Sequence, residues 1–117
     1  MSISTLWFII AIVVIFGIQF LLKRRGRVSQ NILIEKIQSG AKIIDVRTKD
    51  EFQDGHYNKA INIPLNTLSS RLGELGDKSK PIVLYCASGV RSASATQLLK
   101  SNGFIDVVNA GGLGDMP

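Results

Sequence analysis

The stretch that decides the fold is Pro81-Ile82-Val83-Leu84-Tyr85-Cys86-Ala87-Ser88-Gly89-Val90-Arg91-Ser92. Residues 82–85 predict a buried strand, because apolar residues that are mostly β-branched or aromatic follow a proline and precede a turn. Residues 90–100 carry apolar side chains at near-helical spacing and predict a helix. The only cysteine of the chain, Cys86, therefore lies where a strand passes through a short loop into a helix.

Cys86 occupies a position that favours negative charge. Oriented N–H groups and the dipole at a helix amino terminus stabilise anions, and Arg91 places a guanidinium five positions further along. We therefore expect the pKa of the Cys86 thiol to be lowered. A lone cysteine is more often a small buried apolar side chain, but open α/β sheets bind ligands at junctions of this kind. We predict a reactive thiolate.

Composition limits the possible classes of protein. The 117 residues suffice for one domain and a short appendage. The net charge is +5, yet from residue 28 onward ten basic residues face nine acidic ones, so nucleic-acid binding has no electrostatic support. A single cysteine cannot form an intramolecular disulfide, and the sequence has no Cys/His cluster with metal-ligand spacing. We expect neither a metal nor another cofactor.

Residues 6–22 form an apolar run that only Gly17 and Gln19 interrupt, and Ile3 can extend it. As a helix this run spans roughly 25 to 30 Å, about the thickness of the hydrocarbon core of a bilayer. A buried core helix would keep a polar stripe. A cleaved signal peptide would carry basic residues before the run, whereas here they follow it, at Lys23, Arg24, Arg25 and Arg27.

We therefore predict two segments in the chain. Residues 1–27 are expected to be an uncleaved transmembrane anchor with a basic juxtamembrane segment, in contact with the lipid bilayer. Residues 28–117 are expected to form the folded domain. The positive-inside rule places this domain in the cytoplasm, with the amino terminus outside the cell (inner) membrane.

The rest of the chain alternates short helices with short strands. Ser29 or Asn31 can cap a helix that stops at Ser39-Gly40, and residues 48–51 match a capping box for another short helix. Further elements are expected as strands at 43–46, 60–64 and 106–109, a helix at 66–75, and a linker or edge strand at 26–29. This alternation predicts an α/β domain with a parallel sheet and helices on both of its faces.

Three polar residues outside the cysteine loop could also take part in chemistry. Asp45 and Arg47 could act as acid and base, but a charge pair at a strand end usually ties loops together. His56 could act as a general base, or its ring could hydrogen-bond to the loop backbone. We prefer the structural interpretation for all three residues.

The motifs, taken in order, resemble those of the rhodanese family of sulfurtransferases over residues 28–112. They are Ile44-Asp45-Val46-Arg47, Glu51-Phe52, Gly55-His56, Ala60-Ile61-Asn62-Ile63-Pro64, Leu84 to Ser92, Gly103-Phe104 and Gly111-Gly112. The first strand of the family is only faintly visible, at Val28. The resemblance implies a parallel α/β sheet in which the cysteine takes a sulfane sulfur from a donor such as thiosulfate. It also implies that the resulting persulfide passes this sulfur to cyanide or to a thiol.

The resemblance also assigns roles to individual residues. Cys86 becomes the nucleophile, and Asp45, Arg47 and His56 become structural supports. The cradle for the sulfur or for the anionic donor is formed by the backbone amides of Ala87, Ser88, Gly89, Val90 and Arg91, and the Arg91 side chain attracts the donor.

Three other functions compete with sulfur transfer. A cysteine phosphatase or arsenate reductase has a loop one residue longer than the six residues from Cys86 to Arg91, and this chain has no aspartate beside the loop. A non-catalytic docking module usually lacks the cysteine. A third alternative is a membrane-tethered relay that passes a persulfide sulfur to a protein acceptor, and the sequence does not exclude it. The expected small-molecule partners are a sulfur-containing anion as donor and a thiol as acceptor.

Overall fold

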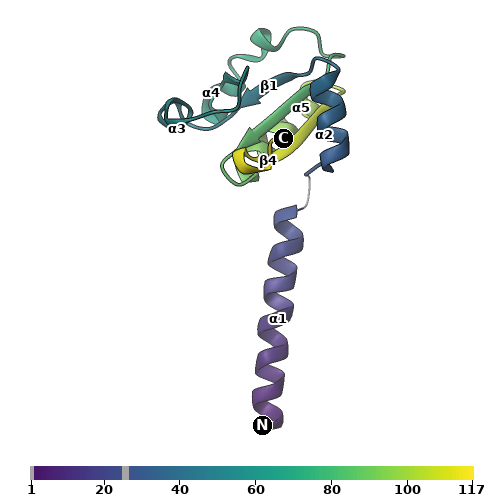
Figure 1. Ribbon diagram of the computed structural model, residues 1–117, viewed down its shortest axis with the longest axis vertical. Helices are drawn as coiled ribbons and strands as arrows, with labels where there is room; N and C mark the ends of the chain where they lie inside the picture. Colours follow the sequence, from purple (N-terminus) through teal and green to yellow (C-terminus); the bar gives the residue numbers. More distant parts are fainter. Residues whose placement is uncertain (1, 25–26) are drawn as a thin grey trace.

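The computed structural model describes residues 2–24 and 27–117, and its centre is a sheet of four parallel strands in the order β2-β1-β3-β4 (Figure 1). The strands are β1 (Lys42–Asp45), β2 (Ile61–Asn62), β3 (Ile82–Cys86) and β4 (Val107–Gly112). The expected parallel α/β sheet is confirmed. Because all strands run the same way, their carboxyl ends meet at one edge, where Asp45 and Cys86 lie.

Helices cover both faces of this sheet, as the sequence predicted. Side chains alternate along a strand, so neighbouring residues of β3 enter different cores: Leu84 on one face, Val83 on the other. The larger core lies under α5 (Val90–Ser101), which contributes Leu99. The smaller core lies under α2 (Gln30–Gln38), which contributes Leu33.

Two predicted helix starts are confirmed by side-chain caps. Ser29 caps α2 by accepting a hydrogen bond from the N–H of Ile32. Thr48 and Glu51 form the predicted capping box at the start of α3 (Lys49–Asp54). In both places the polar side chain lies next to the backbone that it caps, so the local sequence is sufficient to predict the element.

The helix predicted at residues 66–75 is wrong as a single element. The chain forms a short helix, α4 (Leu65–Leu68), and then a 3₁₀ turn, η1 (Leu72–Leu75). The Ser70 hydroxyl donates to the carbonyl of Thr67 at 2.8 Å, a local bond that competes with helical pairing. Leu68 and Leu75 are nevertheless buried, so the apolar spacing correctly predicted which side chains enter the core, although it did not predict the backbone conformation.

Two strand lengths also differ from expectation. The strand predicted at 60–64 is only two residues long, because Pro64 follows and starts α4 as its N-cap. The strand predicted at 106–109 continues to Gly112. Gly111 has φ +97°, which lets β4 shift its register against β3 between Leu84 and Tyr85 and keep pairing.

The chain enters the domain alongside the middle of β4. Of the predicted linker or edge strand at 26–29, residue 26 lies outside the described residues, and Arg27 forms an isolated parallel bridge with Asn109. The Val28 N–H donates to the Asn109 carbonyl at 3.1 Å. The Arg27 guanidinium also pairs with Asp115 of η2 (Leu113–Asp115) at 2.7 Å.

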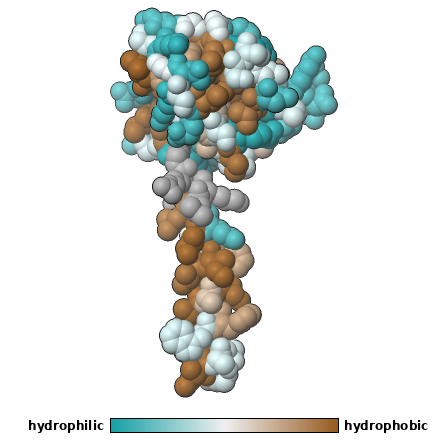
Figure 2. Space-filling model, turned by 180° about the vertical axis from the view of Figure 1, so that it is seen from behind, coloured by the Kyte–Doolittle hydropathy of each residue, from teal (hydrophilic) through white to brown (hydrophobic). Residues whose placement is uncertain are grey.

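The predicted apolar helix is present as α1 (Ile3–Arg24), which extends away from the sheet (Figure 1). None of its membrane-length apolar window, Ile3–Leu21, is buried, which rules out a buried core helix. Figure 2 shows the same helix as a largely brown, exposed rod. Such a helix has the length and composition of a membrane anchor or of a signal sequence.

Candidate active site

The Cys86 sulfur lies at the carboxyl end of β3, beneath the first turn of α5. The residue is only 1% exposed, so its thiol is not free in solvent. The Gly89 N–H donates to Cys86 Sγ at 3.0 Å, and the Ser92 hydroxyl lies 3.4 Å from the same sulfur. The sulfur is thus held in a pocket of hydrogen-bond donors at the predicted strand-to-helix junction.

The pKa of the Cys86 thiol is lowered from its ordinary value, in the predicted direction. Burial by itself raises this pKa, but hydrogen bonds to the sulfur outweigh it. These bonds come from the Ser92 hydroxyl and from the backbone N–H groups of Ser92, Gly89 and Ser88. Donors that converge on one sulfur stabilise a thiolate, which is the nucleophilic form of cysteine.

Glycines fix the position of the cysteine loop. Gly89 has φ +100°, a left-handed conformation that a side chain would strain, and it packs against Gly111. A Cβ on Gly112 would overlap the carbonyl of Ala87. The Gly111-Gly112 pair therefore lets β4 approach the loop closely enough to seat it.

The outer side of the loop faces solvent. Ala87, Ser88 and Val90 are exposed, whereas Gly89 is buried. Val90 is 66% exposed although its side chain is apolar. Among the predicted cradle residues, the N–H groups of Ser88 and Gly89 face the sulfur, whereas Ala87, Ser88 and Val90 are exposed to solvent.

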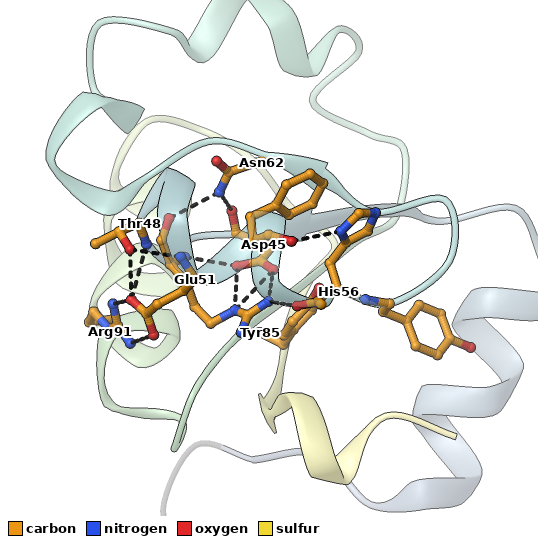
Figure 3. Close-up of polar contacts among 11 residues, drawn as sticks. Asp45, Thr48, Glu51, His56, Asn62, Tyr85 and Arg91 are labelled. Carbon is orange, nitrogen blue, oxygen red and sulfur yellow. Dashed lines mark hydrogen bonds and ion pairs between the residues drawn. The ribbon is translucent and has the colours of Figure 1, made fainter.

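Arg91 does not present a free guanidinium. Its two terminal nitrogens donate to the two carboxylate oxygens of Glu51 at 2.7 and 3.0 Å (Figure 3). The bond from Arg91 is the main reason that the pKa of Glu51 falls to about 2. Arg91 also lines a hollow of about 350 Å³, together with Val46, Thr48, Pro64, Leu65 and Asn66. An anion that approaches the loop therefore meets an ion pair and not a lone positive charge.

Asp45 and Arg47 form a buried ion pair behind the site (Figure 3). Arg47 Nη2 lies 2.7 Å from Asp45 Oδ2 and 2.7 Å from the Gly55 carbonyl, and Asp45 is fully buried. The Asn62 amide donates to the backbone carbonyls of both residues at 3.0 Å. Asn62 thus ties β2 to the end of β1, the ion pair ties the end of β1 to the end of α3, and the Asp45 carboxylate is occupied by Arg47.

His56 lies at the surface beyond α3. Its Nδ1 is 2.8 Å from the Phe52 carbonyl, and its ring stacks on the Phe52 ring at 3.7 Å. Tyr85, on β3, also bonds to the loop that follows α3: its hydroxyl accepts a hydrogen bond from the Tyr57 N–H at 3.0 Å (Figure 3). Burial is the main reason that the pKa of Tyr85 rises to about 12, so this hydroxyl keeps its proton.

Sequence reasoning missed two residues of the site, Ser92 and Asn109. Ser92 is fully buried and Asn109 is 2% exposed, and their side chains meet at 2.7 Å beside Cys86. One signal in the sequence could have identified Asn109: it is a polar residue within a predicted apolar strand, and a buried polar side chain needs a hydrogen-bond partner. Among the residues that the structure describes, no group of three His, Cys, Asp or Glu side chains could hold a metal ion.

The chain is similar to known proteins of the family that the sequence motifs suggested. The family model of the rhodanese-like domain matches residues 29–113. The chain is 39% identical to the uncharacterized protein YqhL of Bacillus subtilis over 89 residues, which cover 74% of this chain and 70% of that protein. It is also 39% identical to the thiosulfate sulfurtransferase PspE of Escherichia coli over 74 residues, which cover 62% of this chain and 71% of that one.

A solved structure and a longer relative complete the comparison. The structure described as rhodanese with anions from E. coli superposes with a TM-score of 0.63 at 38% identity, over 67% of this chain and 95% of that chain. The tRNA uridine(34) hydroxylase of Buchnera aphidicola is 37% identical over 70 residues, but these cover only 22% of that protein. With its sheet order, its cysteine loop and a family match over most of its length, the chain belongs to the rhodanese-like domain family.

Proposed function

We propose that this protein is a sulfurtransferase that carries a sulfane sulfur on Cys86. The observation that carries the proposal is the buried Cys86 sulfur, which accepts a hydrogen bond from the Gly89 N–H at 3.0 Å and whose pKa is lowered. A thiolate held in this way can attack a sulfane sulfur and then hold the negative charge of a persulfide among N–H donors.

The proposed reaction has two balanced steps. The Cys86 thiolate attacks the outer sulfur of thiosulfate, the S–S bond of the donor breaks, and sulfite leaves with the electron pair. The product is a persulfide anion on Cys86. A cyanide or thiolate acceptor then attacks the outer sulfur, and the Cys86 thiolate leaves. No metal, oxidant or external acid is needed in either step.

Similarity supports the same substrate class. The relative PspE is a thiosulfate sulfurtransferase, and its match to this chain includes most of the length of that protein. The match to tRNA uridine(34) hydroxylase covers only a minor part of that enzyme, so it supports the shared domain more than the shared activity. The six-residue loop from Cys86 to Arg91 favours sulfur over a larger tetrahedral phosphate.

Mass spectrometry of the full chain in detergent after treatment with thiosulfate tests the assignment. We expect one added sulfur on the wild-type protein, none on Cys86→Ser, and removal of the sulfur by cyanide. An unchanged transfer rate in Cys86→Ser would refute the choice of nucleophile. Hydrolysis of an aryl phosphate faster than sulfur transfer would favour the phosphatase alternative.

We further propose that α1 anchors the domain in the cell (inner) membrane, with the domain in the cytoplasm. The basic residues Lys23, Arg24, Arg25 and Arg27 follow the apolar segment, and none precedes it. A reducing compartment also protects a single thiolate from irreversible oxidation. In this arrangement the persulfide can be handed to a protein at the membrane, which makes a persulfide relay the second candidate function.

Reporter fusions test the topology. A reporter that is active only in the cytoplasm is expected to work at the carboxyl terminus, and a periplasmic reporter at the same position is expected to be silent. The reverse pattern would overturn the orientation, and a chain cleaved after α1 would identify this helix as a signal sequence.

A further inference from the structure

Asn109 connects three parts of the site through one buried amide. Its Oδ1 accepts the Ser92 hydroxyl at 2.7 Å and the Gly111 N–H at 2.9 Å. Its Nδ2 donates to the Gly89 carbonyl at 3.3 Å. These partners also settle the orientation of the amide, because a flipped side chain would turn its NH₂ group toward the Gly111 N–H.

Ser92 has more acceptors around it than it has protons. Its Oγ lies within hydrogen-bond distance of Asn109 Oδ1 at 2.7 Å, the Gly89 carbonyl at 3.1 Å, the Gly111 carbonyl at 3.3 Å and Cys86 Sγ at 3.4 Å. A hydroxyl has one hydrogen to donate. The shortest contact, with Asn109, is the natural acceptor while the sulfur is neutral.

We propose that the Ser92 hydroxyl hydrogen changes acceptor during the reaction, from Asn109 Oδ1 to the Cys86 sulfur when that sulfur is negatively charged, and back again when the charge leaves it. A charged acceptor attracts a hydroxyl about twice as strongly as a neutral one, which offsets the longer distance to the sulfur. The movement is a rotation about the Cβ–Oγ bond. No covalent bond forms or breaks.

The geometry keeps the cost of this exchange small. When the hydrogen turns away, Asn109 Oδ1 still accepts the Gly111 N–H at 2.9 Å, so it is not left as an unpaired buried acceptor. The bond from Nδ2 to the Gly89 carbonyl keeps the amide in place meanwhile. Asn109 thus acts as a positioning residue that acts on Cys86 through Ser92.

The exchange follows the charge in the proposed reaction. In the thiolate the charge lies on Sγ, and Ser92 donates to it. In the persulfide the charge lies on the outer sulfur, Sγ becomes a neutral bridging atom, and the hydrogen returns to Asn109. The inference deepens the proposed function, but it depends only on Cys86 ionising and not on the identity of the sulfur donor.

The pH dependence of Cys86 alkylation by iodoacetamide, measured on the full chain in detergent, tests the contact with Ser92. In Ser92→Ala we expect the midpoint to move to higher pH, with about a tenfold smaller thiolate fraction below it, because a donor to the charged sulfur is lost. Ser92→Thr should restore the wild-type midpoint. The matched control is Thr96→Val, which removes a buried hydroxyl one turn along α5 that bonds the Ser92 carbonyl and not the sulfur.

A second variant tests the role of Asn109. Asn109→Leu removes the competing acceptor, so we expect the midpoint to move to lower pH. In a Ser92→Ala background the same substitution should have no effect on the midpoint, because its action on Cys86 passes through the hydroxyl. If Asn109→Leu does not fold, Asn109→Asp replaces it. The added carboxylate should hold the hydrogen more tightly and move the midpoint to higher pH.

Specific outcomes would overturn the inference. They are a wild-type midpoint in Ser92→Ala, a midpoint that moves as far in Thr96→Val as in Ser92→Ala, and a midpoint that moves to higher pH in folded Asn109→Leu. If Asn109→Leu shifts the alkylation midpoint equally in the wild-type and the Ser92→Ala backgrounds, Asn109 does not act on Cys86 through Ser92. Failure of the proposed function is a separate result, because it would appear as absent sulfur uptake from thiosulfate with these midpoints intact.

Discussion

Replacing Arg47 with methionine is expected to destabilise the domain strongly. The Asp45 carboxylate is fully buried and accepts hydrogen bonds from Arg47 Nε and Nη2, and the variant removes both donors. Removing one partner of a buried ion pair costs about 3–5 kcal/mol, because the other charge is left uncompensated. Methionine keeps much of the apolar stem, and Asp45 Oδ1 keeps the backbone N–H of residue 47 at 2.9 Å. We therefore expect a loss of about 3 kcal/mol, the lower end of that range.

Urea titration of the full chain in a mild detergent, followed by far-ultraviolet circular dichroism, measures this loss. The matched control is Lys36→Met, which breaks the half-exposed pair with Asp106, 2.8 Å apart, and is expected to cost less than about 1 kcal/mol. The double variant Arg47→Met with Asp45→Asn removes both charges. Its cost should be smaller than the sum of the single costs, because no charge is left buried alone.

Two outcomes would refute this reasoning. If Arg47→Met costs no more than Lys36→Met, the buried pair does not support the fold. If Arg47→Met is as stable as the wild type but transfers no sulfur, then Arg47 has a chemical role and its assignment as a structural support is wrong.

Four further substitutions or titrations probe the site. Glu51→Gln should free the Arg91 guanidinium and lower KM for an anionic donor about two- to fivefold, an effect that disappears in high salt. Since the pKa of Glu51 is about 2 in the folded protein against an ordinary value of 4.5, the stabilisation from this pair should be complete above pH 4.5 and disappear as the pH falls toward 2 in acid unfolding experiments. Gly112→Ala should lower kcat at least about tenfold by displacing the cysteine loop, whereas Gly73→Ala, whose Cβ would meet nothing within 4 Å, should not. In an ultraviolet titration Tyr85 should ionise near pH 12, so its contribution to stability should hold below pH 10 and disappear as the pH rises toward 12.

Much of the fold follows from local patterns in the sequence. An apolar run between a proline and a loop was enough to place β3 and, with it, Cys86 at the end of a strand. Ser29 and Thr48 cap helices whose first turns lie within three residues of them, so each signal is complete in a short window. The same locality made the direction of the pKa of Cys86 predictable, because the donors come from its own loop and from the first turn of α5.

The remaining features depend on contacts between distant parts of the chain. Arg91 was expected to face an anionic donor, but its guanidinium binds Glu51, 40 positions away, and no local pattern indicates this pair. Ser92 meets Asn109 across 17 positions, and this contact joins α5 to β4, two elements that no short window of sequence brings together. The helix expected at 66–75 is wrong because leucine spacing specifies which side chains are buried, and a broken backbone can bury Leu68 and Leu75 as well as a continuous helix can.

The bridge between Arg27 and Asn109 limits how far the reactive sulfur can move from α1. Three Cα steps separate Arg24, the last residue of α1, from Arg27, so the chain between them reaches at most about 11 Å. Arg27 pairs with Asn109, whose side chain hydrogen-bonds to Ser92 beside Cys86, so the short connection from α1 joins the sheet close to the cysteine. If α1 lies in a bilayer, Cys86 is confined to a thin layer of solvent next to the lipid headgroups. A sulfur acceptor confined to that layer would meet it by a two-dimensional search, whereas an acceptor in bulk solvent would have to diffuse to the surface first.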